Sequence, residues 1–213
     1  MTKAVFFDFD GTLANTLPYY LKAYGTVLHT FDLAKSEKEI VQSCFGKRVI
    51  DTCSSLGIPE KVDEFSTLYF DVVKKSFKDA KLFYDTLETL RYLQNKNIKM
   101  AVITFAYRWY IDQMMDQFNL SQFIKVVISA DEVTHSKPHP EAILKACSLL
   151  ETDPKETIVV GDSGSDILMA KAAGSKSALM FPEDYSRYYD FVDLQKTSPD
   201  FTIAKISDLI RLV

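Results

Sequence analysis

Short, almost continuously apolar runs alternate along the chain with longer stretches in which apolar residues recur every three or four positions. The short runs are typical of β-strands buried on both faces, and the longer stretches are typical of amphipathic helices. Strands that alternate with helices predict an α/β fold with a Rossmann-like, doubly wound parallel sheet. The predicted strands are residues 4–9, 99–104, 125–128, 157–161, 178–181 and 201–203.

The connection between the first two predicted strands is much longer than a crossover requires. A crossover to a parallel strand needs about a dozen residues and usually one helix, and residues 86–96 supply that helix. Residues 15–80 remain over and also show helical periodicity, with Thr16 expected to cap the first helix and Pro18 in its first turn. We therefore predict an all-helical domain inserted after the first strand.

This insertion divides the chain into a core, residues 1–14 and 81–213, and a cap, residues 15–80. Ligands of open α/β sheets bind beyond the carboxyl ends of the strands, and the insertion leaves the core at one of those ends. We expect the cap to lie over the ligand site as a lid. The Tyr-rich segment 183–196 is expected to form a surface helix or loop with aromatic anchors.

Composition narrows the class of protein. The 213 residues include 25 basic and 29 acidic side chains, and the mild net charge of −4 argues against a nucleic-acid binder. No apolar run approaches the roughly 20 residues that span a bilayer, and no signal peptide is recognisable. The three cysteines form no CxxC pair. We expect a globular, cytoplasmic protein that is a monomer or a weak dimer, without nucleic-acid or membrane partners.

Two carboxylates close the first predicted strand. Asp8 and Asp10 are spaced by one residue, so their side chains point to the same side of an extended strand. Gly11 follows and allows a turn with positive φ or a close approach to a ligand. Because Asp and Gly are also ordinary residues at a solvated strand end, this motif alone leaves both interpretations open.

A second acidic cluster closes the fourth predicted strand. Asp162 ends the strand, and Asp166 lies about one turn into the following helix, where an acidic residue is also simply favourable for the helix. Carboxylates that converge from two strand ends would repel one another without a cation. A hard divalent ion resolves that repulsion, and Mg²⁺ is the usual choice for a few oxygens, water molecules and a substrate phosphate.

Two further candidates follow the remaining central strands. Thr104 closes the second predicted strand, and Lys137 follows the third, directly before Pro138. Pro138 favours extended backbone at Lys137. A lysine buried beside carboxylates would anchor an anion, whereas an exposed loop lysine would have no such role.

Together, these motifs resemble the haloacid dehalogenase-like superfamily of phosphohydrolases. The pattern comprises DxDGT at 8–12, a Thr at the end of the second strand, a Lys before Pro, and GDSxxD at 161–166. The resemblance runs from the first strand to about Phe181. The helical insertion resembles the cap of the branch that contains phosphoglycolate phosphatase and β-phosphoglucomutase.

The resemblance implies a role for each candidate residue. Asp8 would be the nucleophile that forms an aspartyl-phosphate, and Asp10 the general acid and base. Mg²⁺ would be held by Asp8, the backbone carbonyl of Asp10 and Asp162, with Asp166 orienting the metal's surroundings. The phosphate oxygens would be held by Thr104, the backbone amide at Phe105, and Lys137.

An aspartate at position 10 favours phosphatases and mutases over the dehalogenase, phosphonatase and P-type ATPase relatives, which lack it. We therefore predict a Mg²⁺-dependent phosphatase that hydrolyses a small phosphorylated metabolite. The alternatives are a phosphomutase of the β-phosphoglucomutase type, which returns the phosphoryl group to a sugar, and a non-catalytic protein that binds a phosphorylated ligand. The substrate itself cannot be predicted, since the cap that determines specificity varies on this scaffold.

Other polar residues suggest weaker hypotheses. Lys47 and Arg48 follow Gly46 and interrupt the helical pattern of the cap, so they form either a surface loop or a substrate-specificity loop. The three histidines, His29, His135 and His139, lack the spacing of a zinc site. We expect no metal ligand among them.

Overall fold

The computed structural model describes all 213 residues, Met1 to Val213. The chain forms two compact units. The first comprises Met1–Ala14, Leu82–Glu183 and Val192–Val213, and the second comprises Asn15–Lys81 and Asp184–Phe191. The boundaries expected from the sequence differ from this division at Lys81 and at residues 184–191, which they place in the core.

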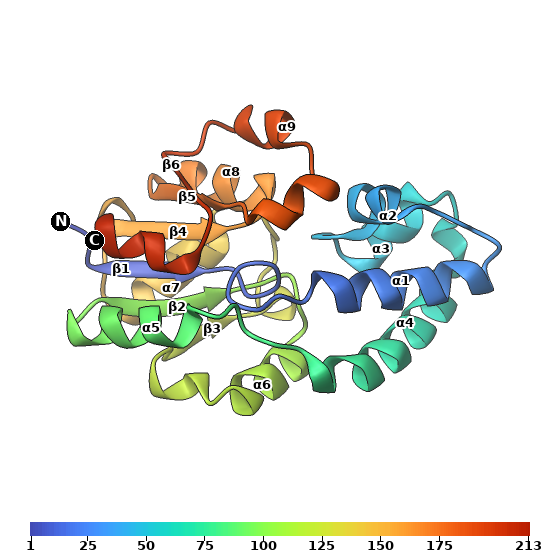
Figure 1. Ribbon diagram of the computed structural model, residues 1–213, viewed down its shortest axis with the longest axis horizontal. Coiled ribbons are helices and arrows are strands. Elements are labelled where there is room, and N and C mark those ends of the chain that lie inside the picture. The colour runs from blue at the N-terminus through green and yellow to red at the C-terminus, as the bar shows by residue number, and fades with distance from the viewer. The chain divides into compact units, whose positions relative to one another are not determined.

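A six-stranded sheet forms the centre of the first unit (Figure 1). All neighbouring strands are parallel, in the order β3-β2-β1-β4-β5-β6. This arrangement confirms the predicted α/β fold with a doubly wound parallel sheet. The strands are β1 (Ala4–Phe7), β2 (Lys99–Ile103), β3 (Val126–Ile128), β4 (Thr157–Gly161), β5 (Lys176–Met180) and β6 (Phe201–Ile203).

Four of the strands differ from their predicted bounds by one or two residues. β1 ends at Phe7 rather than Phe9, and β5 begins at Lys176 rather than Ala178. Strand ends depend on the partner strand as well as on the local apolar run, and Lys176 pairs with Ile158 of β4 although its side chain is exposed. The apolar run therefore predicts where each strand lies, whereas hydrogen bonding to the neighbouring strand determines where it begins and ends.

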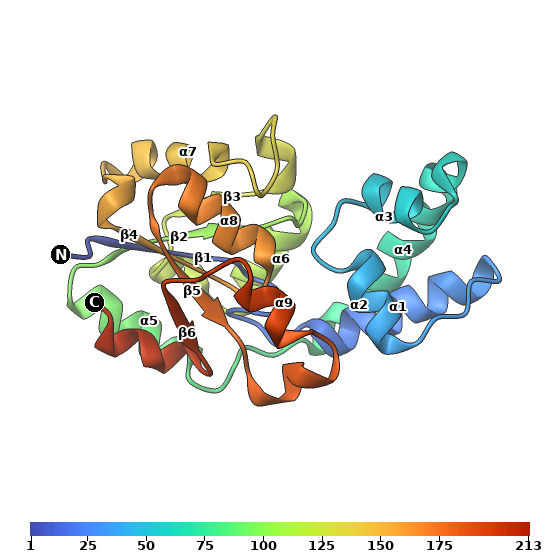
Figure 2. The same ribbon diagram turned by 90° about the horizontal axis from the view of Figure 1, so that it is seen from above.

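Helices cover both faces of this sheet. α7 and α8 lie on one side of the strands in Figure 2, and α5 lies on the other. Phe6, Ala101 and Val159 pack with Ile143 of α7 and Met169 of α8 in one buried cluster. The helices of this unit are α5 (Thr86–Asn95), α6 (Arg108–Gln117), α7 (Glu141–Leu150), α8 (Gly164–Ala173) and, apart from its first residue, α9 (Phe191–Gln195).

The second unit is helical. Its core contains Tyr24 and Tyr69, whose rings stack with centroids 4.6 Å apart, together with the fully buried Phe65. Tyr185 and Tyr189 of the Tyr-rich segment belong to this unit, and Tyr189 packs edge-on against Phe45. Its helices are α1 (Leu17–Thr30), α2 (Glu37–Cys44), α3 (Val49–Ser55) and α4 (Val62–Ser76).

The expected cap of α1 is only partly correct. Thr16 does precede the helix and Pro18 lies in its first turn, but the Thr16 side chain makes no capping hydrogen bond. Its backbone is already near the helical region (φ −97°, ψ −10°), whereas a capping residue normally adopts the β region so that its hydroxyl can reach back. The Thr16 hydroxyl is consequently buried without a partner.

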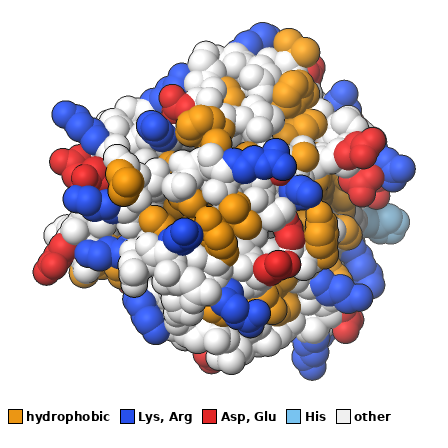
Figure 3. Space-filling view, turned by 60° about the vertical axis from the view of Figure 1, so that its left-hand side comes forward, with side chains coloured by type: hydrophobic (Ala, Val, Ile, Leu, Met, Phe, Trp, Pro, Cys, Tyr) orange, Lys and Arg blue, Asp and Glu red, His pale blue; other side chains and the backbone are white.

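None of the helices has the length and apolarity needed to cross a membrane. On the face drawn in Figure 3, Lys and Arg side chains are scattered among Asp and Glu side chains rather than gathered in one basic stripe. This distribution agrees with the mild acidic charge of the sequence.

Candidate active site

The predicted site residues of the core meet at the carboxyl edge of the sheet. β1, β2 and β4 are adjacent and parallel, so Asp8, Thr104 and Asp162 follow neighbouring strand ends. The Asp8 amide donates to the carbonyl of Val160, which continues the β1–β4 ladder by one residue beyond β1. The position of the Asp8 backbone is therefore fixed by the sheet, independently of the contacts of its side chain.

Lys137 is the centre of a buried ion network. Its Nζ lies 3.1 Å from Asp8 Oδ1 and donates to Asp166 Oδ1 at 2.7 Å. The side chains of Lys137, Asp8 and Asp166 are only 3%, 11% and 1% exposed. Lys137 is thus the buried lysine beside carboxylates, not the exposed loop lysine that the sequence also allowed.

The carboxylates of Asp8, Asp162 and Asp166 form one cluster. One oxygen from each lies within 4.8 Å of the others, and all three residues are buried. Asp162 packs closely against the turn after β1, because a Cβ placed on Gly11 would stand 2.3 Å from Asp162 Oδ2. Gly11 also has a φ of +81°. Glycine is therefore required here both for this backbone conformation and because a Cβ would not fit.

Both carboxylate oxygens of Asp166 are held by hydrogen bonds. Asp166 is the third residue of α8, and its Oδ2 accepts hydrogen bonds from the amide (3.2 Å) and hydroxyl (2.6 Å) of Ser163 in a capping box. Its other oxygen binds Lys137. Gly161 leaves room for it, since a Cβ there would lie 2.2 Å from the Asp166 carboxyl carbon. These contacts suit a residue that positions its neighbours.

Asp10 has a partner that sequence reasoning missed. The hydroxyl of Tyr110 in α6 donates to Asp10 Oδ1 at 2.8 Å. Tyr110 is 3% exposed, and in the sequence it looked like one more member of the apolar face of its helix. Helical periodicity could not reveal this bond, because a buried tyrosine contributes an apolar ring to the pattern whether or not its hydroxyl has a partner.

Thr104 and Phe105 follow β2 at the same edge. Thr104 is buried, and its Oγ1 accepts a hydrogen bond from the Ala106 amide at 3.0 Å, which leaves the hydroxyl proton to donate elsewhere. The Phe105 ring lies 5.4 Å from Lys137 Nζ, within the range of a cation–π contact. Both residues therefore border the ion network.

The electrostatics of the cluster favour a bound cation. The pKa of Asp8 is raised to about 7, because burial raises it more than the charge of Lys137 lowers it, and Asp166 and Asp10 add to the effect of burial. Burial and the charges of Asp8 and Asp166 raise the pKa of Asp162 well above its usual range. Although burial lowers the pKa of Lys137, Asp166 and Asp8 raise it above its ordinary value. One lysine thus faces several carboxylates, and an additional cation fits this donor set.

Lys47 and Arg48 belong to the second unit. Lys47 Nζ donates to the Gln42 carbonyl at 3.1 Å, and Arg48 forms an exposed ion pair with Asp51 at 2.8 Å. Both cations thus have partners within the helical unit. A role in substrate specificity stays a prediction.

The Gly11→Ala variant should show how closely the turn after β1 is fitted to the carboxylates. Alanine at this positive φ costs about 1–2 kcal/mol, and its Cβ would force Asp162 to move. We expect a modest loss of thermal stability and a larger loss of affinity for a divalent cation, measured by calorimetric titration with Mg²⁺. Gly25→Ala is a matched control, since a Cβ there meets nothing within 4 Å. An unchanged Mg²⁺ affinity in Gly11→Ala would contradict the proposed place of Asp162.

Comparisons with known proteins identify the family of this chain. Residues 5–180 match the family model for haloacid dehalogenase-like hydrolases. The chain is 33% identical to the pyrophosphatase PpaX of Anoxybacillus flavithermus, over 98% of this chain and 95% of that protein. A PpaX of Bacillus thuringiensis is 32% identical, with the same shares covered.

Solved structures show the same architecture. A candidate haloacid dehalogenase-like hydrolase from Bacteroides fragilis superposes with a TM-score of 0.87 at 26% identity, covering 98% of this chain and 100% of that one. A candidate phosphoglycolate phosphatase from Lactobacillus plantarum also gives 0.87, at 25% identity and with both chains fully covered. The chain therefore belongs to the haloacid dehalogenase-like hydrolase family, and it is a phosphatase of that family.

Proposed function

We propose that this phosphatase transfers a phosphoryl group from a small substrate to Asp8 and then to water. The observation that carries the proposal is the buried cluster in which Asp8 lies 3.1 Å from Lys137 and within 4.8 Å of Asp162 and Asp166. A protein that only binds a phosphorylated ligand has no need of a buried carboxylate nucleophile with a second carboxylate two residues away.

The first step forms a bond between an Asp8 carboxylate oxygen and phosphorus and breaks the bond from phosphorus to the leaving oxygen. Asp10 donates a proton to that oxygen as it leaves. In the second step Asp10 takes a proton from water, whose oxygen attacks the aspartyl-phosphate and releases phosphate. Asp8 is regenerated as a carboxylate, and Asp10 returns to its protonated form.

The residues present fit Mg²⁺, which prefers oxygen ligands. We propose that Asp8, Asp162 and the backbone carbonyl of Asp10 hold it, while Asp166 positions this arrangement through Ser163 and Lys137. When bound, Mg²⁺ supplies positive charge that favours the ionised form of Asp8 and offsets the charge of the phosphate. Lys137 acts in the same direction, since its charge lowers the pKa of Asp8 against the effect of burial.

Phosphate binding is assigned to residues at the end of β2 and on the segment between β3 and α7. The Thr104 hydroxyl retains a proton to donate, and Lys137 carries a positive charge at the cluster. The backbone amide at Phe105 is proposed as a third donor. Positioning and charge neutralisation of this kind account for most of the catalysis in phosphoryl transfer.

Tyr110→Phe is expected to slow turnover by a factor on the order of 10 to 10², because Asp10 is charged once it has donated its proton and a hydrogen bond to a charged group contributes roughly 1.5–3 kcal/mol. The loss should fall on kcat rather than KM, since the Tyr110 hydroxyl contacts Asp10, the residue to which we assign proton transfer. Asp10→Asn should slow turnover by a factor on the order of 10² to 10⁴.

The double variant distinguishes positioning from a structural role. If Tyr110 acts through Asp10, Tyr110→Phe should have little further effect in the Asp10→Asn background. Equal effects of Tyr110→Phe in both backgrounds would show that it acts independently of Asp10. Tyr107→Phe, at a more exposed position on the turn before α6, is the matched control.

We propose inorganic pyrophosphate as the first substrate to test, because relatives that align along almost the whole chain are pyrophosphatases. The decisive experiment is a phosphate-release assay with pyrophosphate, phosphoglycolate, sugar phosphates and an aryl phosphate, each with Mg²⁺. Failure to hydrolyse any of these substrates would contradict the phosphatase activity. Phosphate transfer to a sugar phosphate without release of free phosphate would instead identify a mutase.

The helical unit is proposed as a cap that closes over the site during turnover and excludes water from it. Lys47 and Arg48 are proposed to contact an anionic substrate from this cap. The expected cytoplasmic location and the monomeric or weakly dimeric state stay predictions.

A further inference from the structure

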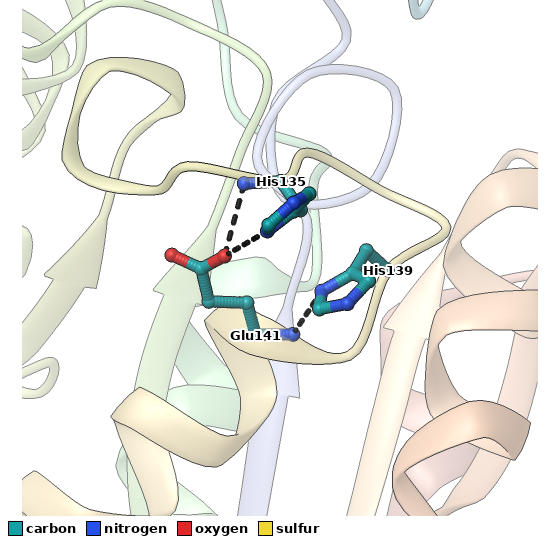
Figure 4. A group of neighbouring side chains, drawn as sticks. All are labelled: His135, His139 and Glu141. Carbon is teal, nitrogen blue, oxygen red and sulfur yellow. Dashed lines mark hydrogen bonds and ion pairs between the residues drawn. The ribbon is translucent and has the colours of Figure 1, made fainter.

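Two histidines and a glutamate meet on the segment that joins β3 to α7 (Figure 4). His135 Nδ1 lies 3.0 Å from Glu141 Oε2, and His139 Nδ1 lies 3.3 Å from the Glu141 amide nitrogen. The two imidazole rings are tilted by 33° to each other, with centroids 4.5 Å apart. One potential ligand atom from each residue lies within 4.8 Å of the other two.

This group is held in place by the backbone around it. The Glu141 carboxylate accepts hydrogen bonds from the amides of Thr134 (2.8 Å) and His135 (2.9 Å). The His139 amide donates to the Ser136 carbonyl at 3.0 Å. The chain therefore folds back on itself, and this turn places His135 against His139, which the spacing of the histidines in the sequence did not indicate.

We propose that His135, His139 and Glu141 form a binding site for one divalent transition-metal ion of the Zn²⁺ class. Imidazole nitrogens with one carboxylate oxygen suit zinc and its neighbours, whereas hard ions such as Mg²⁺ prefer oxygen ligands alone. This donor set differs from the all-oxygen cluster of Asp8, Asp162 and Asp166. The two groups therefore select different ions.

The spacing and exposure of the donors support such a site. Two ligands of a tetrahedral ion with bonds of about 2.0–2.1 Å lie about 3.3 Å apart, close to the 3.0 Å between His135 Nδ1 and Glu141 Oε2. The His135 side chain is 62% exposed and that of Glu141 29%, so an ion can enter and water can complete its coordination. If His139 binds the ion through Nδ1, it loses only the long hydrogen bond that it accepts from the Glu141 amide.

The site flanks Lys137 in the sequence, so ion binding should affect the loop that carries Lys137. His135 and His139 stand two residues before and after Lys137, and Glu141 begins α7. An ion that joins all three closes residues 135–141 into a ring. Occupancy should therefore restrain the segment that presents Lys137, and slow the hydrogen exchange of its amides.

The test is a Zn²⁺ titration of the chain without an affinity tag and with Mg²⁺ at saturating concentration. Calorimetry should show one strongly bound Zn²⁺ per chain. The chain has only three histidines, so their imidazole NMR signals can be followed individually. We expect the signals of His135 and His139 to move on binding and those of His29, an exposed residue of the second unit, to stay unchanged.

The double variant His135→Ala/His139→Ala should bind Zn²⁺ more weakly by a factor on the order of 10² or more, and His29→Ala should bind it normally. Phosphate release with Mg²⁺ and no Zn²⁺ confirms that the double variant is folded. Equal Zn²⁺ affinity in the double variant, with unmoved histidine signals in the parent chain, would place the ion at the aspartate cluster and overturn the proposal.

Discussion

Replacing Asp8 with Asn is expected to reduce the rate of phosphate release by a factor on the order of 10⁴ to 10⁶, the scale seen when the nucleophile of a covalent enzyme is removed. An amide is nearly the same size as a carboxylate but cannot attack phosphorus. Asp8 is buried at the end of β1 and fixed there by its backbone bond to Val160, so the exchange should leave the fold intact.

Two measurements separate loss of the nucleophile from loss of structure. Acid quenching during turnover should trap a phosphorylated Asp8 in the parent enzyme, detectable by mass spectrometry, and no such adduct in Asp8→Asn. Asp85→Asn is a matched control, because Asp85 is another buried aspartate of the core, bound instead to the Ser207 amide. Near-normal turnover in Asp8→Asn would exclude the covalent mechanism.

Replacing Lys137 with Met should lower the free energy of unfolding by about 3–5 kcal/mol, the usual cost of removing one partner of a buried ion pair. Methionine fills a similar volume, so the change removes the charge that faces Asp8 and Asp166 with little loss of packing. The variant should also bind phosphate substrates more weakly.

The loss in Lys137→Met should depend on pH. With Lys137 present, burial and the neighbouring carboxylates raise the pKa of Asp8 from 3.8 to about 7, so its contribution to stability is fully present below about pH 4 and is lost as the pH rises through 7. Lys137 lowers that pKa, and its removal raises it further. The variant should therefore continue to lose stability above pH 7, where the contribution of Asp8 in the parent chain has levelled off.

Urea unfolding at pH 6 and pH 8.5, with a chelator present, measures this difference. Lys145→Met is the surface control, because Lys145 is exposed on α7 and contacts only the carbonyl of Glu132 through its Nζ. A stability deficit in Lys137→Met that is the same at both pH values would show that Lys137 does not govern the ionisation of Asp8.

The class of fold was predictable from the amino-acid sequence, and the structure confirms it. Apolar runs locate the strands, because a strand buried on both faces has few polar positions and this pattern is local. The spacing of Asp8 and Asp10, and the step from Asp162 to Asp166, are local features too. They indicated a carboxylate cluster, and the structure brings Asp8, Asp162 and Asp166 together.

Contacts between residues far apart in the chain depend on the tertiary structure and could not be predicted from the sequence. Tyr110 reaches Asp10 across 100 positions, and Lys137 reaches Asp166 across 29. Neither pairing leaves a periodic signal, since each depends on which strand ends become neighbours and on where a helix begins. Likewise the turn that brings His135 to His139 and Glu141 is made by backbone hydrogen bonds to one carboxylate. Sequence patterns report which face of an element is buried, whereas only the folded chain determines which polar groups meet there.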